Sequence, residues 1–235
     1  MQLFFNPSVD SMAKQLAFGP EESRHITKVL RKREGDIVTI TNGKGDLFKA
    51  KLLIASVKKC QAEIFDTTKT APPKQYLHMA VAPTKLNDRF EWFLEKATEI
   101  GVSEITPIIC ERSERKAVKL ERFEKVLQAA MKQSLQTYLP KLNEAISLKK
   151  FLAVERSGLL FIAHCEENER YALQSKLAKD ANITILIGPE GDFSSSEITL
   201  SLDKGFLPVS LGEHRLRTET AAIVACTTVA VVNNL

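Results

Sequence analysis

The amino-acid sequence predicts an α/β protein in which a small, mostly β module precedes a larger domain built on a parallel sheet. Two observations lead to this prediction. Residues 38–56 alternate apolar and polar positions on either side of an Asn-Gly-Lys-Gly-Asp turn, the pattern of a β-hairpin. From residue 76 onward, short apolar runs alternate with amphipathic helical patterns. Such alternation indicates a parallel sheet with helices on both of its faces.

A polar, proline-containing stretch separates the two parts. Residues 69–75 include two adjacent prolines and interrupt every regular pattern, as a linker between domains does. We therefore expect domains at residues 1–68 and 75–235. The length of 235 residues suits either one large domain or two of ordinary size.

The composition excludes several classes of protein. A chain with 44% hydrophobic and 26% charged residues is typical of a folded globular protein rather than a disordered one. No apolar stretch reaches the ~20 residues that a membrane-spanning helix needs, and the N-terminus lacks the pattern of a secretory signal. We therefore expect a cytoplasmic location. The cysteines are widely spaced without a metal-binding pattern, so we expect four reduced thiols and no metal site, at Cys60, Cys110, Cys165 and Cys226.

The net charge of +4 is concentrated in the first part of the chain. Residues 1–70 hold 12 Lys and Arg residues against 8 Asp and Glu residues, whereas the remainder is balanced. Residues 24–33 contain five of these basic side chains and no acid, on a segment expected to form one short helix from Pro20 to Leu30. An uninterrupted basic cluster indicates a polyanionic partner, although a solvated helix face would have the same composition.

Two longer helices are expected in the second domain. The first begins at Asp88, with Glu91 three positions later as in a capping box, and Gly101 follows as a stop signal. Its buried face is formed by Phe90, Phe93, Leu94, Ala97 and Ile100. The second extends from Leu120 to Tyr138, and Pro140 ends it. The histidine in the preceding strand, His78, is expected to be a packed core residue.

Three strand ends carry the chemically notable residues, at positions 163–167, 187–193 and 211–221. Ligands of open α/β sheets bind beyond the carboxyl ends of the strands, so these segments are the expected site. Dinucleotide-binding, Walker A, serine-hydrolase and zinc-protease motifs are all missing from the sequence. The small residues of Gly188-Pro189-Glu190-Gly191 allow a flat ligand to approach the backbone, and residues 194–197 form a capping box for the next helix.

The third segment changes abruptly from charged to apolar. Thr218 is a good N-cap and Glu219 suits the first turn of a helix whose residues 221–232 carry no charge. A helix that is apolar all round is expected to be buried on every face. Arg215 and Arg217 would then be half-buried at its start, paired with Glu219 or Glu190 or with a ligand. A purely structural ion pair would explain the same pattern.

Several of these motifs together resemble the RsmE family, the 16S ribosomal RNA uracil-N3 methyltransferases of the SPOUT superfamily. The C-terminal match comprises residues 188–191, Leu211-Gly212 and Leu216-Arg217-Thr218-Glu219-Thr220-Ala221. The N-terminal match is Arg24 to Arg31, similar to the HxxxVLR stretch of the family's PUA-like module. Residues 97–102 and Gln133-Ser134 resemble central segments of the family, so the resemblance covers essentially the whole chain.

The resemblance implies a fold that composition does not predict. SPOUT domains have a parallel sheet with a C-terminal trefoil knot, and in this family a small PUA-like β-barrel precedes it. The resemblance also implies a homodimer, S-adenosyl-L-methionine as the cofactor, and 16S rRNA within the small ribosomal subunit as the substrate. The reaction would methylate N3 of a specific uridine, of the uridine 1498 type.

Candidate site residues follow from the matching positions. Arg217 would stabilise negative charge on the uracil ring, and Glu219 would orient an arginine or accept the N3 proton. The RNA-binding candidates are Arg24, His25, Lys28, Arg31 and Lys32. The cofactor-binding candidates are His164, Ile187, Gly188, Pro189, Glu190, Gly191, Leu211, Gly212, Arg215, Leu216, Thr220 and Ala221.

Two positions depart from the family pattern. Asp192 stands where the family usually has a glycine, and His214-Arg215 stands where it often has Arg-Ile. The departure at Asp192 leaves open an RNA-binding protein without catalysis. A further alternative is a SPOUT enzyme acting on a ribose 2′-hydroxyl, which no feature of the sequence favours.

Overall fold

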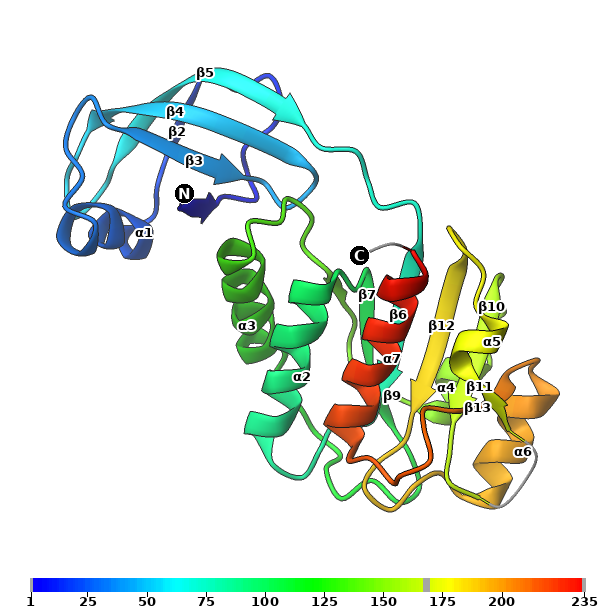
Figure 1. The fold of residues 1–235 in the computed structure, drawn as a ribbon. Helices are drawn as coiled ribbons and strands as arrows, with labels where there is room; N and C mark the ends of the chain where they lie inside the picture. Colours follow the sequence, from blue (N-terminus) through cyan, green and yellow to red (C-terminus); the bar gives the residue numbers. More distant parts are fainter. Residues whose placement is uncertain (1, 167–169, 234–235) are drawn as a thin grey trace. The chain divides into compact units, whose positions relative to one another are not determined.

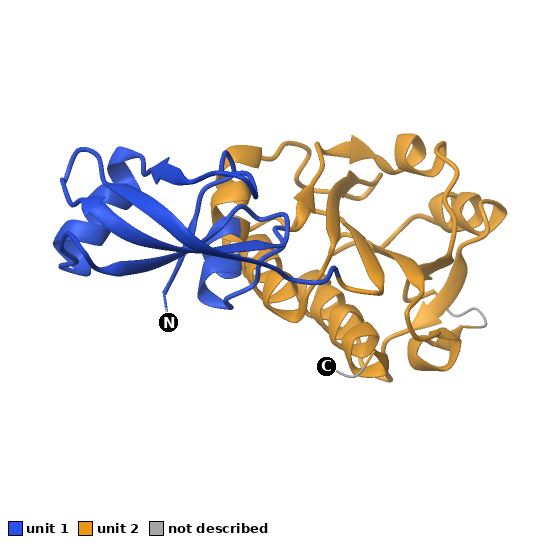
Figure 2. Cartoon of the chain, turned by 90° about the horizontal axis from the view of Figure 1, so that it is seen from above, with its two compact units in different colours: residues 1–72, 128–139 blue, residues 73–127, 140–235 orange. Residues whose placement is uncertain are grey.

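The computed structural model describes residues 2–166 and 170–233 and divides into two compact units. The first unit comprises Met1–Pro72 together with Gln128–Leu139, and the second comprises the rest (Figure 2). The break at Pro72 lies within the expected linker, but the contribution of residues 128–139 to the first unit had no signal in the sequence. No helix in the described ranges is both long and apolar enough to cross a membrane.

The first unit is a small five-stranded sheet in the order β1-β3-β4-β5-β2, with β1 parallel to β3 and the other pairs antiparallel. Asn6 Nδ2 donates to the carbonyl of Ala17 at 3.3 Å and so links the two edge strands. The predicted hairpin is confirmed as β3 and β4. The strands are β1 (Leu3–Phe5), β2 (Gln15–Ala17), β3 (Ile37–Thr41), β4 (Asp46–Ile54) and β5 (Gln61–Lys69).

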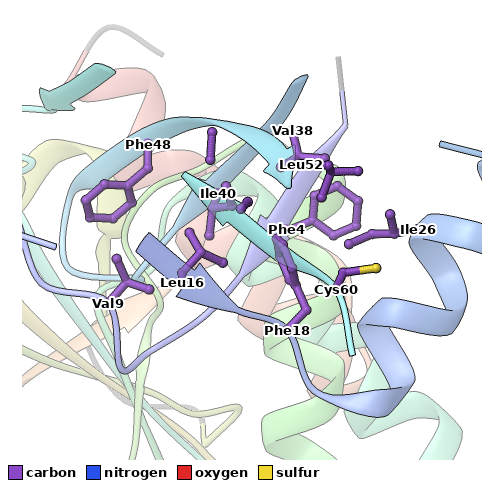
Figure 3. Close-up of a cluster of buried hydrophobic side chains, with 12 residues drawn as sticks. Phe4, Val9, Leu16, Phe18, Ile26, Val38, Ile40, Phe48, Leu52 and Cys60 are labelled. Carbon is purple, nitrogen blue, oxygen red and sulfur yellow. The ribbon is translucent and has the colours of Figure 1, made fainter. Parts of the chain in front are cut away.

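The sheet wraps around its own hydrophobic core (Figure 3). Alternate side chains of the strands point inward, as the two-residue period of a strand requires. Phe48 and Ile40 are completely buried, and Phe4 and Phe18 meet edge to face with ring centroids 5.7 Å apart. This core gives the unit its own source of stability.

Residues 137–139 complete the turn of the hairpin. Gly45 N donates to the carbonyl of Thr137 and Leu139 N to that of Gly43, both at 2.9 Å. Tyr138 Oη donates to the carbonyl of Thr70. A Cβ atom at Gly45 would lie 2.2 Å from Tyr138 Oη, and the φ of Gly45 is +94°, so both space and conformation require glycine there.

The basic cluster does not form the single regular helix expected from Pro20 to Leu30. An α-helical turn, α1 (Pro20–Arg24), is followed by a π-helical turn, η1 (His25–Val29). The wider turn is closed by a hydrogen bond from Leu30 N to the carbonyl of His25 at 3.0 Å. Ile26 is completely buried in the core of the unit, whereas Arg24 and Lys28 are exposed.

The second unit contains the parallel sheet that the alternating pattern predicted (Figure 1). Its order is β11-β13-β10-β12-β6-β7-β8, with β9 also pairing β7, and every pair is parallel. The strands are β6 (Tyr76–Val81), β7 (Glu104–Ile109), β8 (Lys141–Leu142), β9 (Ile146–Ser147), β10 (Leu159–Ala163), β11 (Tyr171–Ala172), β12 (Asn182–Ile187) and β13 (Leu207–Ser210).

Helices cover both faces of this sheet, as expected (Figure 1). Side chains of α4 and α6 share a buried cluster with one set of alternate strand residues, which includes Ala80, Ile162 and Leu186. The helix α7 packs on α2 and contacts β6 and β12. The helices are α2 (Asn87–Ile100), α3 (Leu120–Gln133), α4 (Leu148–Leu152), α5 (Leu173–Lys176), α6 (Ser195–Asp203) and α7 (Thr218–Val232).

The start of α2 differs from the expectation. Its buried face is confirmed by Phe90, Phe93 and Leu94, and Gly101 ends it in the left-handed conformation. The predicted capping box at Asp88 is wrong, because Leu86 is the N-cap and no side chain caps it. Glu91 instead accepts a hydrogen bond from Arg122 Nη2 at 2.8 Å, so a partner distant in sequence displaces the local cap.

The end of α3 was also mispredicted. The helix ends at Gln133 rather than at Tyr138, well before Pro140. Leu135 has a φ of +59°, a left-handed conformation that ends a helix but is rare for a residue other than glycine. Ser134 N and Ser134 Oγ both donate to the carbonyl of Ala130, at 2.9 and 2.8 Å, so the last helical hydrogen bond is shared with a side chain.

His78 is a packed core histidine, as expected, within a buried polar cluster between β6 and β7. Its Nε2 lies 2.7 Å from Thr106 Oγ1, and burial lowers the pKa of His78 to about 4. Burial alone would raise the pKa of Glu104, but hydrogen bonds from Asn143 and Tyr76 outweigh it and bring that pKa to about 2. The cluster therefore holds an ionised carboxylate beside a neutral imidazole.

Candidate active site

The three predicted strand ends converge on one pocket. β13, β10 and β12 are neighbours in the sheet, and the loops after their carboxyl ends surround a cavity of about 290 Å³. This is the position at which open α/β sheets bind ligands. The cavity is lined by Ala163, Cys165, Ile187, Gly188, Pro189, Glu190, Asp192, Arg215, Leu216, Arg217, Thr218 and Ala221.

A smaller cavity of about 70 Å³ shares four lining residues with the first. Its wall is completed by His164, Arg170, Val209, Ser210, Leu211, Gly212 and His214. Together the two cavities reach the lower end of the range typical of small-molecule sites, about 300–1,000 Å³. Small residues and backbone form much of both walls.

Most of the predicted site residues meet here. Ten of the twelve cofactor-binding candidates line one cavity or the other, and Arg217 lines the larger one. Gly191, Thr220 and Glu219 line neither. The lining residues that were not site candidates include Ala163, Cys165 and Thr218, all within the three strand-end segments and therefore within reach of the sequence argument.

Thr218 connects the start of α7 to the loop after β12. It is not the N-cap of α7, contrary to the prediction. Arg217 is the N-cap of α7, and its side chain makes no capping hydrogen bond. The hydroxyl of Thr218 instead donates to the carbonyl of Gly188 at 3.1 Å in a buried position. This bond joins the start of α7 to the end of β12, so it fixes one edge of the larger cavity.

The loop after β12 is held from outside the cavity. Lys85 N donates to Glu190 Oε1 at 2.9 Å, and Arg112 Nη1 donates to the carbonyl of Gly191 at 3.0 Å. A Cβ atom at Gly191 would lie 3.2 Å from Arg112 Cβ, so a larger residue would press against this arginine. Lys85 and Arg112 were not predicted, because they follow β6 and β7 and nothing in their local sequence marks a role.

Asp192 adopts the conformation that suits the glycine usual in the family. Its φ is +62°, in the left-handed region that aspartate tolerates better than most residues. Its Oδ2 accepts a hydrogen bond from Cys165 N at 2.7 Å, and its Oδ1 accepts one from Phe193 N at 2.8 Å. Aspartate in place of glycine at position 192 therefore adds a hydrogen bond between the loops after β10 and β12 and keeps the left-handed backbone conformation.

The arginines are more exposed than expected. Arg215 and Arg217 are both exposed, and neither forms an ion pair with a carboxylate among the described residues. The expected pairing with Glu219 or Glu190 is therefore wrong, and the guanidinium groups remain available at the cavity mouth. Glu219 is buried and faces Arg89 of α2, with Oε1 3.9 Å from Arg89 Nε.

His164 adds a buried polar group to the smaller cavity. Its Nδ1 has no hydrogen-bond partner within the described structure. Burial lowers the pKa of His164, Asp192 opposes this effect, and Arg170 adds to it. Arg170 Nη1 also donates to the His164 carbonyl at 2.7 Å. A neutral imidazole with an unused ring nitrogen is suited to a polar ligand.

The helix α7 is not buried on every face, which corrects the expectation for its apolar run. Ala222, Ala225, Cys226 and Val229 are buried, but Thr227 is exposed and Val231 is 58% exposed. The apolar composition therefore leaves one side of the helix uncovered within this chain.

The fold and the pocket define the class of the protein as an α/β RNA methyltransferase with an additional small β unit. A family model described as an RNA methyltransferase domain matches residues 71–230, and one described as an RNA methyltransferase PUA domain matches residues 18–65. The chain belongs to the ribosomal RNA small subunit methyltransferase E family, which the sequence motifs indicated.

Three relatives illustrate the similarity. Ribosomal RNA small subunit methyltransferase E of Mesomycoplasma hyopneumoniae is 32% identical, with 86% of this chain and 88% of the relative covered. The crystal structure of a probable rRNA-methyltransferase from Porphyromonas gingivalis is 38% identical, with a TM-score of 0.92 over 99% of this chain and 98% of the other. The crystal structure of a ribosomal RNA small subunit methyltransferase E from Neisseria gonorrhoeae, bound to S-adenosyl methionine, is 26% identical in sequence. Its TM-score is 0.88 over 99% of this chain and 98% of the other.

Proposed function

We propose that the protein methylates N3 of a specific uridine in 16S rRNA, with S-adenosyl-L-methionine as the methyl donor. The observation that carries this proposal is the pair of adjoining cavities at the carboxyl ends of β10, β12 and β13. They are lined by Gly188 and Gly212 and by Arg215 and Arg217, which have no carboxylate partner among the described residues. The relatives supply the class of substrate through their names.

The cofactor fits the donor set of this pocket. Backbone at Gly188, Leu211 and Leu216 offers hydrogen-bonding groups, and His164 Nδ1, which has no partner among the described residues, offers one more. A Cβ atom at Gly188 would lie 3.0 Å from the Phe193 ring, so the close backbone approach depends on glycine. Arg215 lies at the cavity mouth, where it would meet a carboxylate.

When bound, S-adenosyl-L-methionine supplies a methyl group that is already activated on a sulfonium. The chain must align uracil N3 and stabilise the negative charge that loss of the N3 proton places on the ring. Arg217 is assigned this stabilising role, because it lines the larger cavity and has no carboxylate partner among the residues that the structure describes. Glu219 acts at a distance, by holding the start of α7 through Arg89.

The exposed apolar side of α7 supports a homodimer. A second subunit would cover Val231 and its half-buried neighbours Ile223 and Val224, which solvent otherwise contacts. The C-terminal trefoil knot belongs to the same proposal, and the bond between Thr218 and Gly188 would fasten its entry.

The basic cluster supports contact with RNA. Arg24, Lys28 and Arg31 are exposed, whereas Lys32 Nζ donates to the carbonyl of Ile37 at 3.0 Å. Such side chains hold phosphates and position the RNA rather than read its sequence. The ribosomal small subunit is the proposed context of this contact.

A methylation assay tests the proposal. Small subunits and free 16S rRNA from a strain lacking the gene would be incubated with the protein and S-adenosyl-L-methionine, and the methylated nucleotide mapped by mass spectrometry. One methyl group on a uracil base at N3 is the expected result. A methyl group on ribose would overturn the assignment of the base. No transfer, together with no stabilisation by the cofactor in a thermal melt, would indicate a non-catalytic RNA-binding protein.

A further inference from the structure

Another cavity, of about 320 Å³, lies within the first unit. It is formed by the start of β1, by the turn between α1 and η1, and by the segment that contains the end of α3. The lining residues are Gln2, Leu3, Glu22, His25, Ala129, Lys132, Gln133 and Leu135. Of these, only His25 was a candidate for RNA contact from the sequence.

The walls combine apolar surface with side chains suited to a base edge. Leu3, Ala129 and Leu135 provide the apolar surface, and Gln2 and Gln133 each bring an amide that both donates and accepts hydrogen bonds. Imidazole rings such as His25 stack on nucleobases. A flat heteroaromatic group with a polar edge matches this combination.

The charged residues of the cavity compensate each other. Lys132 Nζ lies 2.8 Å from Glu22 Oε1, and His25 Nδ1 lies 3.8 Å from Glu22 Oε2. The Glu22 carboxylate neutralises Lys132 and faces the cavity, which makes the cavity a poor site for a phosphate. Gln2 Nε2 also lies 3.3 Å from His25 Nε2, so a hydrogen bond joins two side chains of the wall.

The backbone at the rim is held in an unfavourable conformation. Leu135 has a φ of +59°, and the residue is 41% exposed. A bulky residue in the left-handed region at a helix end is disfavoured relative to glycine, and such residues occur at ligand sites. Here the left-handed residue is a leucine, so an apolar side chain lines the cavity where glycine would provide none.

Two exposed basic side chains lie on either side of His25 in the sequence. Arg24 directly precedes His25, Lys28 follows one turn later, and both are exposed. We propose that the cavity receives one unstacked base of the RNA substrate, with His25, Gln2 and Gln133 contacting the base while Arg24 and Lys28 hold adjacent phosphates. This inference rests on the proposed function, because it takes RNA as the substrate.

The test is equilibrium binding of a single-stranded RNA oligonucleotide covering the methylation site to the whole protein, over a series of salt concentrations. Gln133→Leu should weaken binding about tenfold, the size of one lost base contact, without changing the slope of log K against log salt. Arg24→Gln should instead reduce that slope by about 0.7, the value for one phosphate of a single strand. Gln128→Leu, on the same helix but outside the cavity lining, is the matched control and should bind normally.

An abasic scan identifies the base. Abasic nucleotides placed one at a time should weaken binding to the wild type about tenfold at one position, and that loss should disappear in Gln133→Leu, because the partner is already gone. Equal losses at every position in both proteins, or normal binding by Gln133→Leu, would overturn the proposal. Weakened binding to small subunits with normal binding to free RNA would assign the cavity to a protein partner and likewise overturn it.

The methylation assay separates this inference from the proposed function. If the wild type transfers no methyl group, the proposed function fails. If the wild type methylates uridine and Gln133→Leu has the same KM for RNA, only the base-binding cavity fails.

Discussion

Arg89 Nε lies 3.9 Å from Glu219 Oε1, so the buried carboxylate at the start of α7 faces α2 rather than the arginines beside it in sequence. The other oxygen, Oε2, is buried without a hydrogen-bond partner among the described residues. We therefore assign Glu219 to positioning the start of α7, which carries Arg217 and Thr218.

Replacing Arg89 should lower the free energy of unfolding, and replacing Glu219 as well should recover most of the loss. Arg89→Met would leave the Glu219 carboxylate buried and unpaired, which we expect to lower the free energy of unfolding by about 1–3 kcal/mol. In the double variant with Glu219→Gln, no unpaired charge remains, so most of this loss should be recovered. Urea unfolding of the four proteins measures the coupling. Additive losses would show that the two side chains do not interact.

Arg217→Ala should greatly reduce methyl transfer while cofactor affinity stays within a few-fold. The side chain is exposed and makes no capping bond, so its removal leaves the fold intact. Loss of one electrostatic contact to a developing charge typically lowers kcat by about 10²–10³. Arg215→Ala is the matched variant at the same cavity and should raise the Kd for S-adenosyl-L-methionine instead. Calorimetry and single-turnover transfer separate the two effects, and a loss of cofactor binding by Arg217→Ala would contradict its role.

The substitution series at Asp192 separates backbone conformation from hydrogen bonding. Asp192→Asn keeps an acceptor for Cys165 N and tolerates the left-handed conformation, so its cofactor affinity should be close to that of the wild type. Asp192→Gly keeps the conformation but loses the link. Asp192→Ala loses both and should bind cofactor most weakly, with a free energy of unfolding lower by about 1–2 kcal/mol. Equal affinities across the series would show that the link does not shape the pocket.

The buried cluster on β6 and β7 should make the protein sensitive to acid. The pKa of Glu104 is lowered to about 2, so its contribution to stability is complete above its ordinary pKa of 4.5 and declines as the pH falls toward 2. The pKa of His78 is lowered from 6.5 to about 4, so the fold favours the neutral ring and its contribution declines between those values. Both effects have the same sign, and the urea midpoint should fall from pH 6.5 downward.

A matched pair of variants tests the source of this acid sensitivity. Glu104→Gln should have a lower urea midpoint at pH 7 and a shallower dependence on pH below 4.5. Glu144→Gln, which alters an exposed carboxylate, should keep the slope of the wild type. Identical slopes in all three proteins would assign the acid sensitivity to other groups.

Features with a periodic pattern were predictable from the sequence. The hairpin around residues 42–45, the buried face of α2 with Phe90 and Phe93, and the parallel strands all follow from alternation or from helical spacing. The capping box at residues 194–197 was also correct, because both partners are local. The convergence of the three strand ends followed from the general placement of ligands in α/β sheets.

Features that depend on distant partners were not predictable. Asp88 looked like a cap, but Glu91 turns to Arg122 instead. Thr218 looked like a cap, but its hydroxyl bonds to Gly188, thirty positions earlier. Glu219 looked like a partner for its neighbouring arginines, but it faces Arg89 on another helix. In each case a local rule was outweighed by a contact that only the folded chain creates.

The closure of the hairpin turn by residues 137–139 affects how this protein can be divided or recombined. A fragment ending at the linker, at Pro72, would keep all five strands of the first unit but lose the peptide groups that bond to Gly43 and Gly45 and the tyrosine that bonds to Thr70. A chimaera of two homologues with one junction at the linker would combine the five strands of one protein with residues 137–139 of the other. Chimaeras should therefore be viable only when both segments are inherited together.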